Sequence, residues 1–427
     1  MRDTLRADLN INSERGRLVR SAGATAAIKV GATIVSFGAS LLYARVLGPH
    51  DYGLYAYVLA WVAVLTIPSG LGLPPYLIRE GARAPGKLHA LRRWADGRVL
   101  VSGLVIAVLM ASAVFLPSAA GARWLFIIAA PLPLLNNLGY VRRALIQAHG
   151  WVARSQFPAL LLAPVLMLIT LLVVWQLTGS LNTTVVMIAM TTVALVPFIA
   201  NSLQLRRIET PDERSNYSLS LGSALPFVWF GTLYLLNSRI DLIILGALKG
   251  AHAAGIYAVA TRATDFIAFF LLAANIVIES RIARLHHGGE IKALQRLLTA
   301  AMRRVAVLTL PLALLLILGA TPMLRYLYGT PYAEGAIAMR ILAAAQLVNV
   351  LAGPTATILN MTGGERYSVR GTALAVLFNC ALNLLLIPLY GLAGSAIATG
   401  ISLVGWNILL WYWVRTKLQL RPSAIGL

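Results

Sequence analysis

Long apolar segments dominate this chain and leave few ways for it to fold. Twelve of them have about 20 or more residues, the length that a helix needs to cross the hydrocarbon of a bilayer. They lie at about 21–47, 53–78, 98–120, 123–148, 155–177, 183–205, 222–248, 253–279, 297–320, 333–360, 367–390 and 391–414. Only 12% of the 427 residues are charged, whereas soluble domains carry about a quarter. The sequence therefore predicts an all-α polytopic membrane protein with about 12 transmembrane helices.

The basic residues predict how these helices are oriented. With the N-terminus placed in the cytoplasm, 28 of the 36 Lys and Arg residues lie in the inner tails and loops. The outer loops hold Arg45, Arg123, Lys249 and Arg325. Because cytoplasmic loops are enriched in Lys and Arg, we expect both termini in the cytoplasm. The net charge of +21 is then a consequence of topology, and we expect no nucleic-acid partner.

Polar stretches mark the expected domain boundaries. Residues 1–20 are charged and have no apolar core, which indicates a cytosolic tail and not a cleaved signal peptide. A polar linker at 206–221 separates an N-lobe at 21–205 from a C-lobe at 222–414, and a short cytosolic tail follows at 415–427. We interpret the linker as a connector without a regulatory role.

The two lobes carry related short motifs about two hundred residues apart. Gly53-Leu54-Tyr55-Ala56 corresponds to Gly255-Ile256-Tyr257-Ala258, and LIQAHG at 145–150 resembles ILNMTG at 358–363. Such repeats indicate a doubled architecture. With six spans in each lobe, an even number, both halves point the same way. We therefore expect two pseudo-symmetric six-helix lobes related by an axis along the membrane normal.

Sequence patterns of known catalytic sites are missing from this chain. It contains no P-loop, no HExxH and no GxSxG, and the six His residues do not have metal-ligand spacing. The single Cys380 excludes a disulfide within the chain and a thiolate metal cluster. The expected outer loops are short. We therefore expect that the protein has no catalytic residues and no metal site, and that it is not an enzyme.

Charged residues inside the expected spans are the strongest functional signal. A charge at the centre of a membrane costs about 2.5–3.5 kcal/mol on insertion scales and usually lines a cavity or pairs with another charge. Lys29, Arg239 and Arg262 outnumber Asp241 and Asp265 by one. A cavity lined by these residues would attract an anion, and an anion that needs twelve helices to cross is expected to be the phosphorylated head of a lipid.

Three points in this interpretation stay open at the level of sequence. Arg262 and Asp265 are separated by three residues and would neutralise each other on one helix face. Lys29 would alternatively extend towards the inner lipid headgroups. Asp241 and Asp265 are the only deep carboxylates, so they are the candidates for Na⁺ or H⁺ coupling.

Several amide side chains in the spans are candidates for contacts with sugar hydroxyl groups. Taken one at a time, each is more often a hydrogen bond between helices than a ligand contact. The candidates are Asn136, Asn137, Gln147, Asn275, Gln346 and Asn349.

Two turns carry a family resemblance. At the end of the first span, Arg45 is followed by Leu47-Gly48-Pro49 and Asp51-Tyr52-Gly53. In the seventh and eighth spans, Ile240-Asp241 is followed by a Gly-x-Tyr motif at 255–260. Both resemble polysaccharide-transport flippases of the multidrug/oligosaccharidyl-lipid/polysaccharide (MOP) exporter superfamily. The chain is similar to Wzx-type O-antigen and exopolysaccharide flippases and, more remotely, to lipid II flippases. The resemblance extends over all twelve spans, although specific motifs occupy only these turns.

The resemblance implies two lobes that open alternately to the two sides of a bacterial cytoplasmic (inner) membrane. Its implied substrate is an oligosaccharide linked to undecaprenyl pyrophosphate, moved outward for the assembly of O-antigen, capsule or exopolysaccharide. Lys29, Arg239, Arg262 and Arg45 are then the expected substrate-binding residues. Implied partners are membrane lipids and, in the same pathway, a polymerase and glycosyltransferases. No cofactor is expected apart from Na⁺ or H⁺ coupling.

Two alternatives to a flippase remain. A multidrug cation exporter of the same superfamily needs buried carboxylates, commonly in its N-terminal half, where this chain has Lys29 and no deep Asp or Glu. A membrane-bound polysaccharide polymerase or ligase needs a large external loop, which the expected topology does not provide.

Overall fold

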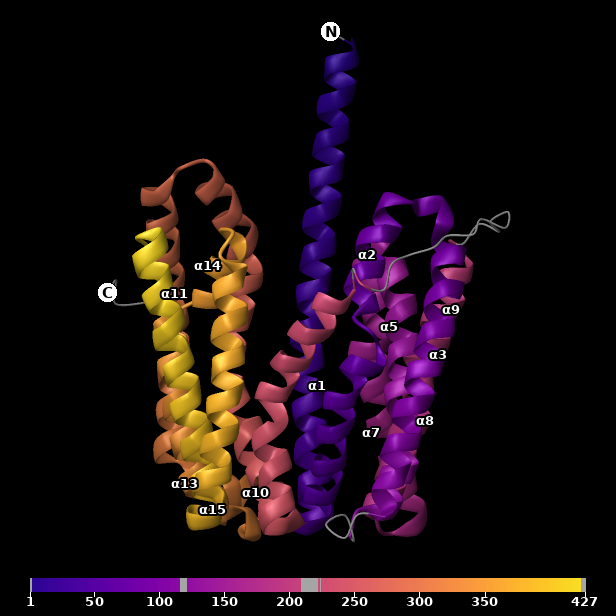
Figure 1. Ribbon diagram of the computed structural model, residues 1–427, viewed down its shortest axis with the longest axis vertical. Coiled ribbons are helices and arrows are strands. Elements are labelled where there is room, and N and C mark those ends of the chain that lie inside the picture. The colour runs from indigo at the N-terminus through magenta and orange to yellow at the C-terminus, as the bar shows by residue number, and fades with distance from the viewer. Residues whose placement is uncertain (1, 116–120, 209–221, 223, 424–427) are drawn as a thin grey trace. The chain divides into compact units, whose positions relative to one another are not determined.

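The computed structural model describes residues 2–115, 121–208, 222 and 224–423 (Figure 1). These residues form helices and turns and contain no β-strand. The predicted linker at 206–221 lies largely outside the described residues, as does the end of the predicted tail at 415–427. The expectation of an all-α fold is confirmed.

Contacts between residues divide the chain into two compact units. The first comprises residues 1–40 and 65–231, and the second comprises 41–64 and 232–427. Residues 41–64 belong to the N-lobe by sequence but contact the second unit in this structure. The division into two six-helix lobes at the linker stays a prediction.

The first unit is a bundle of helices around α5. Its elements are the first part of α1 (Arg2–Ser69), α2 (Leu73–Arg83), η1 (Pro85–Lys87), α3 (Leu88–Ser112), η2 (Ala113–Phe115), α4 (Arg123–Ala129), α5 (Leu132–Ala148), α6 (Val152–Phe157), η4 (Pro158–Leu162), α7 (Ala163–Thr178), α8 (Thr183–Val193) and α9 (Leu195–Arg206). Helix α5 packs against α2, α3 and α9. Leu77, Leu91, Val141 and Leu145 are fully buried at these contacts and form part of the unit's core.

The second unit contains the remaining helices, packed side by side (Figure 1). They are α10 (Leu225–His287), α11 (Ile291–Leu318), α12 (Ala320–Leu327), η6 (Thr330–Gly335), α13 (Ala336–Ala352), α14 (Thr355–Met361) and α15 (Glu365–Leu418). Helix α13 packs against α11 and α15, and α14 packs against α15. Residues 41–64 of α1 complete this unit.

Three helices are too long for a single crossing and are broken by a glycine. α1 has 68 residues, α10 has 63 and α15 has 54. Each contains one glycine with non-helical dihedral angles: Gly48 (φ 72°, ψ 172°), Gly250 (φ 83°, ψ 179°) and Gly391 (φ 56°, ψ −127°). Glycine adopts positive φ without a Cβ clash, so these residues allow the chain to turn.

Side chains on either side of each glycine meet, which shows that the chain reverses there. Tyr257 donates a hydrogen bond of 2.7 Å to Asp241, sixteen residues away, whereas a continuous helix would separate such residues by about 24 Å. Likewise the rings of Tyr43 and Tyr55 lie 6.0 Å apart, and Ser395 donates to Asn383 over 3.0 Å. α1, α10 and α15 are therefore hairpins.

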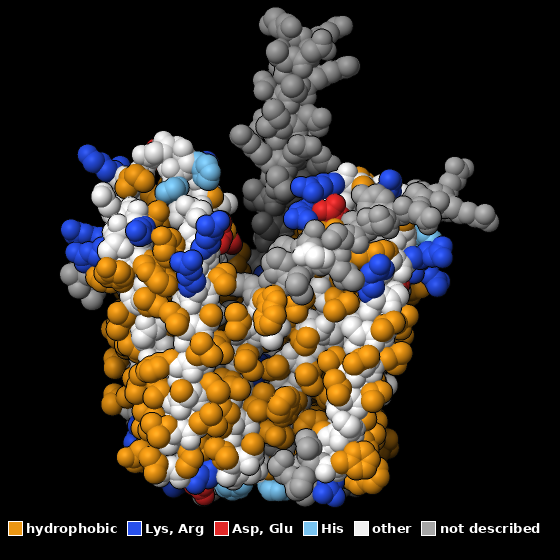
Figure 2. Space-filling model, viewed as in Figure 1, with side chains coloured by type: hydrophobic (Ala, Val, Ile, Leu, Met, Phe, Trp, Pro, Cys, Tyr) orange, Lys and Arg blue, Asp and Glu red, His pale blue; other side chains and the backbone are white. Residues whose placement is uncertain are grey.

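The described residues include nine helices long and apolar enough to cross a membrane. Three of the nine are these hairpins, each with two apolar arms; the count of about 12 transmembrane helices stays a prediction. Large apolar side chains remain exposed on them, such as Val108 and Leu377, each 68% exposed. Figure 2 shows hydrophobic side chains along the helices and Lys and Arg gathered near their ends. Because soluble proteins rarely expose such continuous apolar surfaces, the chain is a multi-pass membrane protein.

The repeated motif forms a reciprocal contact between the hairpins of α1 and α10. A Cβ atom at Gly53 would overlap the carbonyl oxygen of Ala251, and one at Gly255 would overlap the carbonyl oxygen of Pro49. The two residue pairs are shifted by the same number along the sequence, as are Gly48 and Gly250. Contacts that exchange in this way are those of an approximate two-fold axis. This contact also explains why residues 41–64 join the second unit.

The second motif pair forms the same turn in both halves. Gly150 (φ 93°) follows α5, and Gly363 (φ 82°) follows α14. The next amide donates to the carbonyl five residues earlier in each case, over 3.1 Å from Trp151 to Ile146 and 2.7 Å from Gly364 to Leu359. This is the hydrogen bond of a helix that ends at a left-handed glycine. Both motif pairs therefore mark equivalent turns.

Candidate functional site

The α10 hairpin places two arginines at the same depth. Arg239 lies eleven residues before Gly250 and Arg262 twelve residues after it, so each is about 17 Å along its arm from the turn. Both side chains are half-buried. Within the described ranges, neither guanidinium group makes a hydrogen bond or a contact ion pair. They are unpaired cations inside a membrane-spanning hairpin.

Two tyrosines lie beside this arginine pair. Both guanidinium groups interact electrostatically with the hydroxyl group of Tyr52, and Arg262 also interacts with that of Tyr328. Tyr52 is 5% exposed and Tyr328 is 3% exposed. The Tyr328 hydroxyl group is buried and has no hydrogen-bond partner among the residues that the structure describes, which is uncommon and calls for an explanation in function. Guanidinium and tyrosine hydroxyl groups are both donors that can bind an anion.

Asp265 is an acidic group on the same arm of the hairpin as Arg262. Its carboxylate interacts electrostatically with Arg262 and Arg239, but no contact ion pair joins it to either within the part of the chain that the structure describes. Its side chain is exposed. Direct neutralisation of Arg262 by Asp265 is therefore not observed, and the role of Asp265 in ion coupling stays a prediction.

Asp241 lies in a separate, buried polar cluster. Its carboxylate accepts hydrogen bonds from the hydroxyl of Tyr257 (2.7 Å), the hydroxyl of Thr399 (3.1 Å) and the backbone N–H of Leu242 (2.8 Å). Tyr257 is fully buried. These bonds join both arms of the α10 hairpin to α15.

The cluster continues along α15. Ser395 lies against the Tyr257 hydroxyl and donates a hydrogen bond of 3.0 Å to Asn383. Asn383 in turn donates to the side chain of Asn379 over 2.6 Å. Asn379, Asn383 and Ser395 are buried. A chain of hydroxyl and amide groups therefore extends from Asp241 across the α15 hairpin.

Sequence reasoning missed the α15 part of this cluster. Asn379 and Asn383 are four residues apart, and so are Ser395 and Thr399. This spacing places each pair on one helix face. Two polar pairs of this kind in neighbouring apolar segments could have indicated a polar contact between the segments. Their connection to Asp241 is tertiary and has no counterpart in the sequence pattern.

The other predicted charged residues lie elsewhere. Lys29 belongs to the first unit, where its side chain is exposed on α1, and its contribution to an anion site stays a prediction. Arg45 belongs to the second unit and lines a pocket with residues of α12.

The predicted sugar contacts divide into two groups. Asn137 is buried and donates to the carbonyl oxygens of Thr66 (2.7 Å) and Pro133 (2.9 Å). Gln346 accepts from Asn349, whose own carbonyl accepts from Asn407 on α15. Asn137 and Asn349 thus make the hydrogen bonds between helices that were the alternative, whereas the bond between Asn349 and Gln346 lies within α13. Those whose side chains make no hydrogen bond among the described residues are Asn136, Gln147 and Asn275.

The fold of the chain is that of MOP-superfamily transporters. It matches an inward-facing multidrug resistance MATE family transporter of the MOP superfamily with a TM-score of 0.73, covering 92% of this chain and 98% of that one at 15% identity. It also matches the lipid II flippase MurJ in an inward closed conformation with a TM-score of 0.67, covering 91% and 87% at 16% identity. At such identities the likeness concerns the fold alone.

Sequence comparison gives the family. A model described as "polysaccharide biosynthesis protein" matches residues 18–286, and the chain belongs to this family. A second model, MatE, matches residues 230–385. The probable flippase AglR of Haloferax volcanii is 28% identical over 218 residues, which are 49% of this chain and 45% of that protein. The match thus spans slightly less than half of the relative. The superfamily resemblance drawn from the two turns is confirmed.

Proposed function

We propose that this protein is a flippase that moves a lipid-pyrophosphate-linked oligosaccharide from the cytoplasmic to the outer leaflet by alternating access. The observation that carries the proposal is the unpaired, half-buried pair Arg239 and Arg262 inside the α10 hairpin. Membership of the polysaccharide biosynthesis family and the similarity to a relative named as a flippase support it.

The arginine pair suits a diphosphate. Two unpaired guanidinium groups inside a membrane are costly unless a ligand supplies the opposite charge. A guanidinium group can bind a phosphate through two parallel hydrogen bonds, so one arginine on each arm of the hairpin suits the two phosphates of a diphosphate. An inside-negative membrane potential favours outward movement of such an anion by about 2.3 kcal/mol per charge per 100 mV. We propose undecaprenyl or a related polyprenyl as the lipid, and O-antigen, capsule or exopolysaccharide assembly in a bacterial inner membrane as the pathway.

A multidrug cation exporter is the alternative that the MatE match supports. A cationic drug needs an available carboxylate at a low-dielectric site. The carboxylate of Asp241 in this hairpin is only 5% exposed, which leaves no access for a drug-sized cation, and the groups that interact with Tyr52 include two arginines. The geometry therefore favours an anionic substrate. A polymerase or ligase, the alternative of another class, would lengthen or transfer the glycan and not only move it.

Transport by the purified protein tests the proposal. Vesicles carrying the protein and a fluorescent polyprenyl-pyrophosphate oligosaccharide are treated with a membrane-impermeant quencher. We expect label from the inner leaflet to become accessible much faster than in protein-free vesicles, without a change in the chemical structure of the glycan. No acceleration, together with uptake of a cationic dye, would establish the exporter instead.

We further propose that the Asp241 cluster binds the coupling cation, Na⁺. Na⁺ is a hard cation that prefers oxygen ligands, and Asp241, Thr399, Ser395 and Asn383 supply one carboxylate among neutral oxygen groups. Asp241 also interacts electrostatically with Arg239. A cation that neutralises Asp241 would strengthen the attraction of the arginine pair for an anion, and by linkage the anion would strengthen cation binding.

Binding measurements in Na⁺ and in choline test this coupling. We expect Na⁺ to increase the affinity of the purified protein for farnesyl pyrophosphate about fivefold or more, which is the lower end of typical coupling between sites. Asp241→Asn should remove this dependence because the variant lacks the charge that Na⁺ neutralises. Glu279→Gln is the matched control, since Glu279 is an exposed carboxylate on the same helix. Equal Na⁺ dependence in the wild-type protein and Asp241→Asn would contradict the assignment.

A further inference from the structure

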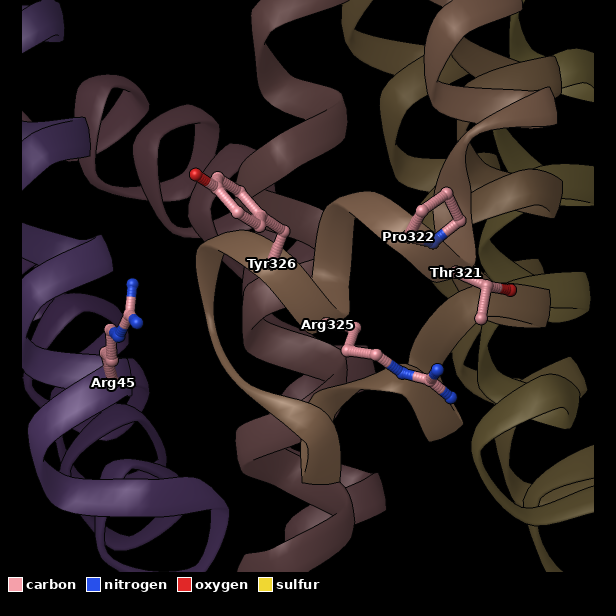
Figure 3. A pocket seen from close by; sticks show the side chains of 5 residues that line it. All are labelled: Arg45, Thr321, Pro322, Arg325 and Tyr326. Atoms are coloured by element: carbon pink, nitrogen blue, oxygen red, sulfur yellow. The ribbon is translucent and has the colours of Figure 1, made fainter.

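A pocket in the second unit lies between α1 and α12. It has a volume of about 640 Å³ and is lined by Arg45, Thr321, Pro322, Arg325 and Tyr326. In Figure 3 the side chain of Arg45 on α1 lies across from Tyr326, and the side chain of Arg325 extends from α12 in the direction away from Arg45. It is separate from the arginine pair of the α10 hairpin, none of whose residues lines it.

Positive charge in this pocket is not neutralised by the protein. Arg45 and Arg325 are exposed, and within the described ranges neither guanidinium group has a hydrogen bond or ion pair. The pocket lining includes no carboxylate. Tyr326, with 82% of its surface exposed, adds an aromatic ring and a hydroxyl group. This combination of groups suits a phosphate-containing ligand.

A buried hydrogen bond fixes the two sides of the pocket relative to each other. The Tyr332 hydroxyl group donates over 2.7 Å to the backbone carbonyl of Ala44, the residue before Arg45. Tyr332 is 1% exposed and lies in η6, which follows α12 after a short turn. The Tyr328 and Tyr332 rings lie 5.9 Å apart and complete the connection to α12. The backbones that carry Arg45 and Arg325 are therefore held in place before a ligand arrives.

The pocket lies at the end of the helices where the α1 hairpin turns. Arg45 precedes Gly48, the turn of this hairpin, by three residues, and α12 is the short helix between α11 and α13. The positive charge in the loops predicts that this end faces outward. Arg45 and Arg325 are two of the four cations predicted on that side.

We propose that this pocket binds the pyrophosphate group at the outer end of the transport path, after the group leaves Arg239 and Arg262. The assignment of the ligand as a lipid pyrophosphate rests on the proposed function. The volume lies within the range of about 300–1,000 Å³ that is usual for ligand sites, and it leaves room for the first sugar beside Tyr326. Exposed arginines bind more weakly than buried ones because solvent screens their charge, and this difference favours release.

Protection of a thiol in the pocket tests the proposal directly. In a Cys380→Ser background, Tyr326→Cys places a reactive thiol at the pocket, and its rate of modification by a maleimide reports occupancy. We expect inorganic pyrophosphate and farnesyl pyrophosphate to slow modification. Adding Arg45→Gln or Arg325→Gln should raise the concentration of pyrophosphate that halves the modification rate by about tenfold, as expected for loss of one charge-assisted contact. Arg123→Gln is the matched control, an exposed arginine predicted on the same side but outside the pocket.

The experiment also separates the sources of the phosphate. Vesicles of phosphatidylglycerol are compared with vesicles of phosphatidylcholine, without pyrophosphate. The proposal is supported if both vesicle types protect the thiol equally and pyrophosphate protects it more strongly than either. Protection by phosphatidylglycerol as strong as that by pyrophosphate would overturn it in favour of a lipid-headgroup site, and so would pyrophosphate protection that Arg45→Gln and Arg325→Gln leave unchanged. Because binding is measured without transport, failure here leaves the flipping result intact.

Discussion

Replacing Arg262 with Gln is expected to slow flipping of the lipid-pyrophosphate oligosaccharide at least about tenfold, and Arg239→Gln should do the same. The loss of a hydrogen bond to a charged group costs about 1.5–3 kcal/mol, and neither guanidinium group donates a hydrogen bond to any residue in the described part of the chain. The double variant should transport no faster than protein-free vesicles. The rate of label exposure in reconstituted vesicles measures all three.

Arg284→Gln is the matched control for both variants. Arg284 lies in the last turn of the same helix, α10, and its side chain is exposed. We expect its flipping rate to stay close to that of the wild type. Arg262→Lys separates charge from geometry, because Lys keeps the charge but not the planar pair of donors. If Arg239→Gln and Arg262→Gln both flip the lipid at the rate of the wild type, the basis of the proposed function is removed.

The fold was largely predictable because the features that set it are local. The length of the apolar segments gives the arms, and Gly48 and Gly250 occupy the turns that the repeated motif indicates. The similar spacing of Arg239 and Arg262 from the α10 turn, eleven and twelve residues, follows from the same reasoning. Boundaries differ where short helices interrupt a segment; one example is α12, between Ala320 and Leu327, which forms part of the pocket wall.

The partners of the site residues were less predictable because they depend on tertiary contacts. The sequence marks Asp241 only as a deep carboxylate, whereas its partners are Tyr257 and, on α15, Thr399. Asn137 has an amide side chain of the kind that contacts sugars. In the first unit, however, its hydrogen bond joins α5 to the end of α1. A polar residue in an apolar segment indicates that a partner exists; the packing decides whether the partner is a helix or a ligand.

Gly53→Ala is expected to destabilise the second unit by more than about 3 kcal/mol, the upper end of the usual cost of overpacking. The added Cβ would overlap the carbonyl oxygen of Ala251, a backbone atom that cannot rotate away. Gly255→Ala should have the same effect, since its Cβ would overlap the carbonyl oxygen of Pro49. Thermal unfolding in mild detergent, followed by loss of the monodisperse peak, measures the difference.

The reciprocal geometry of this contact also predicts how much the double variant is destabilised relative to the two single variants. One small separation of the α1 and α10 hairpins relieves both overlaps, so Gly53→Ala combined with Gly255→Ala should cost clearly less than the sum of the single changes. Gly38→Ala and Gly405→Ala are the controls: both glycines are helical and exposed, and a Cβ there meets nothing within 4 Å. They should be neutral or stabilising, because Ala favours a helix over Gly by about 1 kcal/mol. Additive costs at Gly53 and Gly255, or costs no larger than those of the controls, would mean that the two hairpins do not meet at these glycines.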